Sequence, residues 1–129
     1  MKGLHLIADL HDCRCPADFL LDAAGLESFC VSACRRHGLT VVGQLFHAFR
    51  DAAGAAAGIT GTVVLAESHL AVHTWPELDS VTLDIYVCNF SGDNSARAEA
   101  LFTEVVDAFA PIHLQRQAVS RGSLTAAAP

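Results

Sequence analysis

Residues 80–88 read SVTLDIYVC, and apolar and polar side chains alternate along the whole stretch. A period of two residues places alternate side chains on opposite faces of a β-strand. Residues 3–10 alternate in the same way, with Leu4, Leu6 and Leu10 on one side. Such alternation is typical of antiparallel sheets that bury one face and leave the other in contact with solvent. The two stretches therefore predict strands of one half-buried sheet.

The rest of the chain is expected to add further strands and two helices. Strands are predicted at 39–49, 60–67, 70–75 and 112–120, and the stretch RDAAGAAAG at 50–58 predicts a loop. Apolar residues at helical spacing predict helices over 17–37 and about 94–109, the second capped by Asp93 or Asn94. Gly25 weakens the first helix, which can therefore start later than Pro16 indicates. This order predicts the α+β class: a two-layer sandwich of an antiparallel sheet with two helices on one face.

The composition describes one apolar, acidic domain. The chain has 129 residues, 52% of them hydrophobic and 17% charged, which predicts a single globular domain over 1–129 rather than a disordered chain. The formal net charge is -6, so nucleic acid is not expected as a partner. No apolar run is long enough to span a bilayer, and the first residues are polar too early for a signal peptide. A cytoplasmic protein without a membrane partner is expected.

Five cysteines and seven histidines raise the question of metal binding. The odd number of cysteines argues against a disulfide framework, and their spacing fits no common zinc module, so reduced thiols and no metal are predicted. His69 and His73 lie on one face of their predicted strand. On this pattern alone they are compatible with zinc ligands, with groups that flank a substrate, or with polar residues on a half-exposed sheet.

A longer motif narrows these alternatives. Residues 66–77 read AESHLAVHTWPE, which closely resembles the self-processing segment of the prokaryotic S-adenosylmethionine decarboxylase proenzyme family. The resemblance extends to Asp9 and Cys13, to the segments 46–49 and 58–61, and to the strand that ends at Cys88. It covers roughly residues 3–109.

The resemblance implies that the chain cuts itself between Glu67 and Ser68 into a β chain (1–67) and an α chain (68–129). In this chemistry the Ser68 hydroxyl attacks the Glu67 carbonyl, and loss of the Ser68 α-proton then expels the carboxylate by β-elimination. The dehydroalanine that remains hydrolyses to a pyruvoyl group. By similarity, His73 is the base in this processing, and Thr60 stands where the family has an assisting serine.

The resemblance further implies a decarboxylase whose cofactor is this pyruvoyl group. The group forms a Schiff base with the amine of the substrate and accepts the electrons that are released with CO2. Cys88 corresponds to the family's proton donor, Glu77 to a residue that binds the substrate ribose, and Phe49 to an aromatic side chain that stacks on adenine. Spermidine synthesis, which uses the decarboxylated product as aminopropyl donor, is the implied pathway. A homodimer of cleaved protomers, with active sites at or near its interface, is the implied assembly.

Several departures from the family pattern fall near the substrate. Leu78, Asp79 and Ser80 replace a Tyr-Gly-Tyr sequence, and Asn89 replaces a glycine after the catalytic cysteine. Asp79 adds a carboxylate that can pair with an amine or a guanidinium group. The preferred substrate is S-adenosylmethionine, and arginine or ornithine on the same framework is the alternative; both classes are small cations. An uncleaved regulatory or binding subunit is the alternative of another class.

Overall fold

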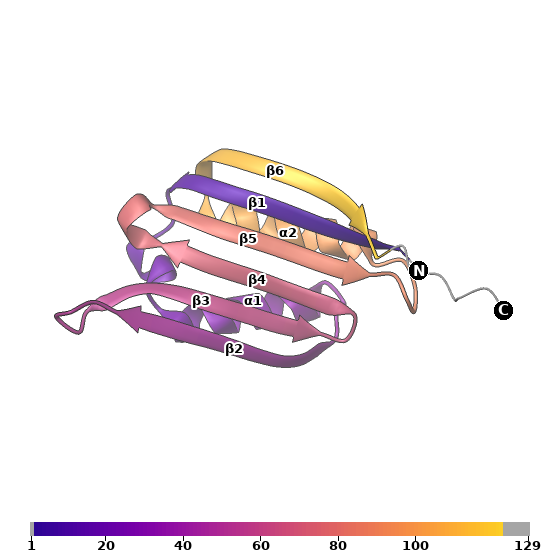
Figure 1. The fold of residues 1–129 in the computed structure, drawn as a ribbon, viewed down its shortest axis with the longest axis horizontal. Coiled ribbons are helices and arrows are strands. Elements are labelled where there is room, and N and C mark those ends of the chain that lie inside the picture. The colour runs from indigo at the N-terminus through magenta and orange to yellow at the C-terminus, as the bar shows by residue number, and fades with distance from the viewer. Residues whose placement is uncertain (1, 123–129) are drawn as a thin grey trace.

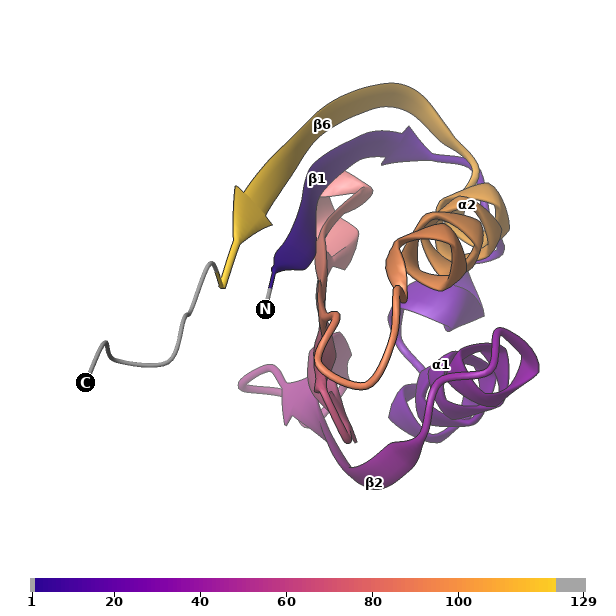
Figure 2. The same cartoon turned by 90° about the vertical axis from the view of Figure 1, so that its right-hand side faces the viewer.

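The computed structural model describes residues 2–122, which form a six-stranded antiparallel sheet with two helices on one face (Figures 1 and 2). The strands are β1 (Gly3–Cys13), β2 (Val41–Arg50), β3 (Ala56–Leu65), β4 (Ser68–Trp75), β5 (Ser80–Cys88) and β6 (Pro111–Arg121). They lie in the order β2-β3-β4-β5-β1-β6. The helices are α1 (Ala23–Arg36) and α2 (Ser95–Phe109). The predicted α+β sandwich is confirmed.

The hydrophobic core lies between the sheet and the helices. Alternate residues of β1 and β5 are almost fully buried, among them Leu6, Leu10, Ile85 and Val87, and they face apolar residues of α2 such as Phe109. The opposite face, which we call the open face, carries no helix of the described residues in Figure 2. The alternation in 3–10 and 80–88 therefore reports one buried and one open face, as predicted.

The structure corrects the predicted bounds of the first helix and of one loop. Residues 17–20 form a short 3-10 helix, and α1 begins only at Ala23, where the Asp22 side chain accepts a hydrogen bond from the Gly25 backbone N–H at 3.1 Å. An N-cap of this kind starts a new helix, which explains why Gly25 is tolerated close to its beginning. The loop predicted at 50–58 is shorter, because β2 runs to Arg50 and β3 begins at Ala56.

The second helix begins close to the predicted position. α2 starts at Ser95, and the Asp93 carboxylate accepts from the Ser95 backbone N–H at 2.9 Å. Asn94, the other predicted cap, makes no capping bond with its side chain and is used elsewhere. Neither helix, nor either of the 3-10 turns within residues 2–122, is long and apolar enough to cross a membrane.

Candidate functional site

The predicted cleavage site lies in the tight turn between β3 and β4. β3 ends at Leu65 and β4 begins at Ser68, so the Glu67–Ser68 bond closes a short hairpin. Ser68 has φ 156°, a positive value that residues with a side chain rarely adopt. Its hydroxyl is buried and has no hydrogen-bond partner within the described residues. A strained backbone and a buried, unsatisfied hydroxyl are both costly, and such features are typical of functional positions.

The carbonyl of Glu67 is held by the neighbouring strand. Its oxygen accepts a hydrogen bond from the Cys88 backbone N–H at 2.9 Å. A backbone N–H at this point can stabilise the negative charge that develops on the oxygen when a nucleophile adds to the carbonyl. The turn thus places an attackable carbonyl, an oxyanion donor and a neighbouring hydroxyl together.

The side chain of Glu67 is fixed by the segment before α2. One carboxylate oxygen accepts from the backbone N–H of Ser91 at 3.1 Å and from its hydroxyl, and the other accepts from Asn94 Nδ2 at 2.8 Å. Asn94 is 7% exposed; its Nδ2 also donates to the Cys88 carbonyl, and its Oδ1 accepts from Arg97. Ser91 carries no signal in the sequence and Asn94 was predicted only as a cap, because Glu67, which both contact, lies 24 and 27 residues away in the chain.

Cys88 ends β5 and lies at intermediate burial, as Cys15 does, whereas Cys13, Cys30 and Cys34 are buried. Burial raises the pKa of the Cys13 thiol to about 11 and that of Cys34 to about 11, and it raises the pKa of Cys30 as well. These three thiols are therefore protonated core residues, and no disulfide joins any two cysteines of residues 2–122.

A second group of predicted residues gathers at the other end of the sheet. Thr60 and His73 are paired across β3 and β4, and Thr60 Oγ1 lies 2.7 Å from His73 Nδ1. Both line a cavity of about 320 Å³ to which Phe49, Trp75 and Glu77 also contribute. This size lies at the lower end of the range for small-molecule sites. An aromatic side chain in the cavity can stack on a flat ring of a ligand, and a carboxylate there can accept hydrogen bonds from hydroxyl groups of the same ligand.

Gly58 is required at the wall of this cavity. It has φ 142°, and a Cβ atom there would lie 3.0 Å from the Thr74 carbonyl oxygen and 3.3 Å from Pro76. Asp79, in contrast, is not among the residues that line the cavity. It is exposed, has a left-handed backbone with φ 47°, and its carbonyl accepts from the Cys13 N–H at 2.9 Å.

The two groups of residues are not brought together within one chain. Ser68 and His73 are five positions apart on β4, which is about 17 Å at roughly 3.3 Å per residue. They also point to opposite faces. Ser68 pairs with the buried Val87 on the helix side, whereas His73 pairs with Thr82 on the open face. His73 of a chain is therefore out of reach of Ser68 of the same chain.

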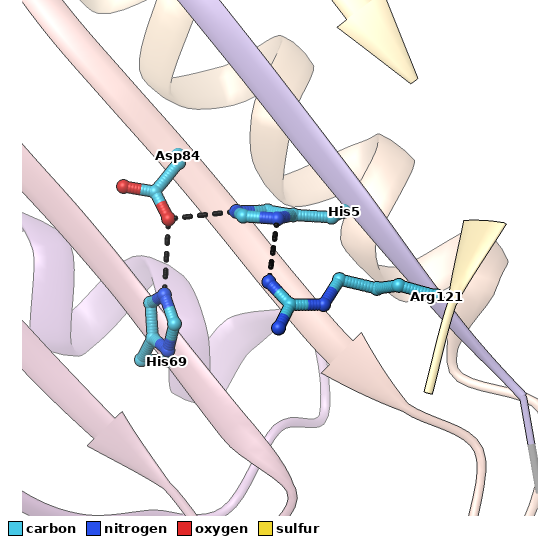
Figure 3. Close-up of polar contacts among 4 residues, drawn as sticks. All are labelled: His5, His69, Asp84 and Arg121. Atoms are coloured by element: carbon cyan, nitrogen blue, oxygen red, sulfur yellow. Dashed lines mark hydrogen bonds and ion pairs between the residues drawn. The ribbon is translucent and has the colours of Figure 1, made fainter. Parts of the chain in front are cut away.

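A polar network covers the open face near the Ser68 end of the sheet (Figure 3). Asp84 Oδ2 lies 2.8 Å from His5 Nε2 and 2.9 Å from His69 Nε2, and His5 Nδ1 lies 3.1 Å from an Arg121 nitrogen. Within residues 2–122, His5, His69 and Asp84 are the group of metal-ligating types that lie close enough to share an ion. Arginine can only donate, so it makes His5 Nδ1 an acceptor and leaves the proton on Nε2, facing Asp84. The geometry is that of a hydrogen-bonded network, with Arg121 also stacked on Tyr86.

Comparison with known proteins identifies related sequences and related solved structures. The family model described as S-adenosylmethionine decarboxylase matches residues 4–122. A proenzyme of that name from Picrophilus torridus is 34% identical over 121 residues, which cover 94% of this chain and 85% of the relative. One from Pelotomaculum thermopropionicum is 38% identical over 86 residues, covering 67% of this chain and 63% of the relative, so the match spans a little under two thirds of that protein. The crystal structure of the Aquifex aeolicus adenosylmethionine decarboxylase superposes with a TM-score of 0.81 at 28% identity and covers 98% of this chain and 96% of that one.

Proposed function

Because the chain belongs to the S-adenosylmethionine decarboxylase family, we propose that it is a pyruvoyl-dependent decarboxylase of S-adenosylmethionine that supplies the aminopropyl donor for spermidine synthesis. The observation that carries the proposal is the strained Ser68, with its buried, unpartnered hydroxyl next to the held carbonyl of Glu67. These features also support Ser68 as the precursor of a pyruvoyl group. A cytoplasmic location is part of the proposal.

Self-processing uses only groups that copies of this chain supply. The Ser68 hydroxyl adds to the Glu67 carbonyl while the Cys88 N–H stabilises the oxyanion, and the C–N bond then breaks to give an ester and a free amine. His73, held by Thr60, takes the α-proton of Ser68, and the electron pair forms the double bond that expels the Glu67 carboxylate. Addition of one water and loss of ammonia complete the conversion.

In the decarboxylation that follows, the pyruvoyl carbonyl supplies the electron sink. Cys88 delivers a proton to the α-carbon of the product. Glu77 accepts hydrogen bonds from the ribose hydroxyls, and Phe49 stacks on the adenine ring in the cavity that both residues line. The net charge of -6 favours the approach of a cationic substrate. Asp79 motivated arginine or ornithine as alternatives, but it does not line this cavity.

We further propose that the active site is shared between two copies of the chain. Processing needs the His73 imidazole close to the α-carbon of Ser68. Within one chain the two residues are about 17 Å apart along β4, at about 3.3 Å per residue, so one chain does not supply both to the same site. In a two-fold dimer that pairs the open faces, the Ser68 end of one protomer meets the His73 end of its partner, twice. Exposed apolar side chains on the open face, such as Ile7, Leu45 and Val64, support burial of that face.

The intact mass of the purified protein tests the cleavage. We expect two chains, 1–67 and 68–129, the second lighter by one ammonia than simple hydrolysis would leave it. Reduction with borohydride in the presence of substrate should attach the substrate to the second chain. A single uncut chain without decarboxylase activity would overturn the proposal and favour a regulatory or binding subunit.

Release of CO2 tests the substrate. We expect release from S-adenosylmethionine and none from arginine or ornithine supplied at the same concentration. Release from an amino acid alone would retain the pyruvoyl chemistry but refute the substrate. Elemental analysis of the active protein tests the prediction that no metal is required, because a stoichiometric metal whose removal abolishes activity would contradict it.

A further inference from the structure

We propose that Arg97 binds the α-carboxylate that self-cleavage creates at Glu67, so that the cavity between the β3–β4 turn and the start of α2 is a docking site for the new chain end. The inference rests on the proposed self-cleavage. It assigns a role to a residue of this chain that takes no part in the chemistry itself.

Cleavage changes the charge of the site. One water is consumed and ammonia leaves, so a neutral peptide group becomes a neutral ketone on the α chain and a carboxylate on the β chain. Glu67 then carries two negative groups, its side chain and its new terminus. One oxygen of the new carboxylate is the former Glu67 carbonyl oxygen, and the other is the former Oγ of Ser68. A site with two carboxylates is stabilised by a neighbouring cation.

The geometry directs the new oxygen toward Arg97. Ser68 pairs with Leu65 and Val87, which are 5% and 1% exposed, so its Oγ lies on the helix side of the sheet. A cavity of about 180 Å³ lies there, lined by Leu65, Glu67, Val87 and Arg97. The oxygen that Ser68 gives up therefore starts on the side of the sheet where the guanidinium lies.

The donors around Glu67 are already used in the uncut chain. Its side chain takes the donors of Ser91 and one N–H of Asn94, and its carbonyl takes the Cys88 N–H. The added oxygen thus needs a donor that none of these contacts provides. A guanidinium has five N–H donors and pairs well with a carboxylate.

Arg97 is held beside Glu67 and has donors to spare. Its Nη1 donates to Asn94 Oδ1 at 2.8 Å, and the same amide donates to the Glu67 carboxylate at 2.8 Å, so Asn94 bridges the two side chains. Within residues 2–122, Arg97 forms no ion pair. Gly38 leaves room for it, since a Cβ atom there would lie 3.2 Å from Arg97 Nε. The cation is therefore in place before the charge that it binds exists.

The test compares one substitution in cut and uncut protein. Arg97→Gln is made in the processing chain and in Ser68→Ala, which lacks the nucleophile, and urea unfolding is followed at equal protein concentration. We expect Arg97→Gln to raise the unfolding equilibrium constant about two- to fivefold more in the cut than in the uncut protein, and this excess to shrink with added salt. Arg97→Lys should retain part of the effect. Arg116→Gln, which removes an equal charge on β6, is the matched control and should act alike in both backgrounds.

The outcomes separate this inference from the proposed function. An equal effect of Arg97→Gln in both backgrounds would overturn the role of Arg97 while leaving self-cleavage intact. A Ser68-containing parent that shows one uncut chain by intact mass would refute the proposed function instead. If Arg97→Gln does not fold in either background, the smaller excess expected for Arg97→Lys decides: its presence supports the docking site, and its absence refutes it.

Discussion

Two inactive variants should restore self-cleavage to each other if the site is shared. Ser68→Ala lacks the nucleophile and His73→Ala lacks the base, so neither should cut itself when it is alone. In a hybrid dimer, one site holds both substitutions and the other holds none. The intact site contains Ser68 of the His73→Ala chain and His73 of the Ser68→Ala chain. Only the His73→Ala chain should therefore be cut.

The structure sets the size of the effect. Ser68 and His73 of one chain are about 17 Å apart along β4, against about 3 Å for proton transfer. Action within one chain is thus excluded. When equal amounts are unfolded together and refolded, random two-fold pairing puts about half of the His73→Ala chains into hybrids. About half of all His73→Ala chains should then be cut, and none of the Ser68→Ala chains should be.

The assay is intact mass spectrometry of the mixture and of each variant alone. His113→Ala, which changes an exposed histidine on β6, is a control that should cut itself without help. Different affinity tags on the two variants show whether hybrids form. If tagged hybrids are recovered and the His73→Ala chain in them stays uncut, the shared site is refuted. Cleavage of His73→Ala alone would refute the role of His73.

Three further changes test the supporting residues. Thr60→Ala should slow cleavage about tenfold, because one hydrogen bond that orients His73 is lost, whereas Thr60→Ser should restore it; equal rates in the two variants would argue against the hydroxyl. Asp84→Asn should lower the free energy of unfolding by about 1–3 kcal/mol in urea, since the shared charged acceptor of two histidines is lost, and an unchanged midpoint would contradict a structural role for the network. Stability should fall between about pH 9 and 11: the unfolded thiols of Cys13 and Cys34 ionise near 9.0, while their folded pKa values are about 11, so protons bind more tightly to the folded state. Urea titrations across this range check the direction of the change, and Cys34→Ala should make the fall in stability with pH smaller.

The sheet was predictable because strand periodicity depends only on neighbouring residues. Alternation in 3–10 and 80–88 identified the buried side of β1 and β5 without knowledge of their partners. The helix bounds were less predictable, because apolar spacing continued through the 3-10 helix, and the cap at Asp22 decides where α1 starts. The apolar spacing is compatible both with one long helix and with a 3-10 helix followed by α1. The spacing alone does not distinguish the two, whereas the cap at Asp22 does.

The candidate site was predictable as a set of residues but not as a geometry. The motif at 66–77 identified Glu67, Ser68 and His73 by resemblance, although nothing in it indicates which chain supplies which residue. Strand parity was a usable signal, since residues five apart in a strand point to opposite faces. Asn94 could not be assigned to the site, because its contacts to Glu67 and Cys88 depend on how α2 returns to the sheet.

The strand order also favours folding before the proposed cut. β2 and β3 at one edge of the sheet come from residues 1–67, β4 and β5 from the later segment, and β1 from the first segment again, between β5 and β6 (Figure 1). A cut after Glu67 therefore leaves two chains that alternate within one sheet and share three ladders: β3 with β4, β5 with β1, and β1 with β6. Each chain alone would expose long unpaired strand edges, which favour aggregation. If the proposed cut occurs, the uncut chain is thus the form in which we expect the sheet to assemble, and the three ladders are the contacts that would keep the products together.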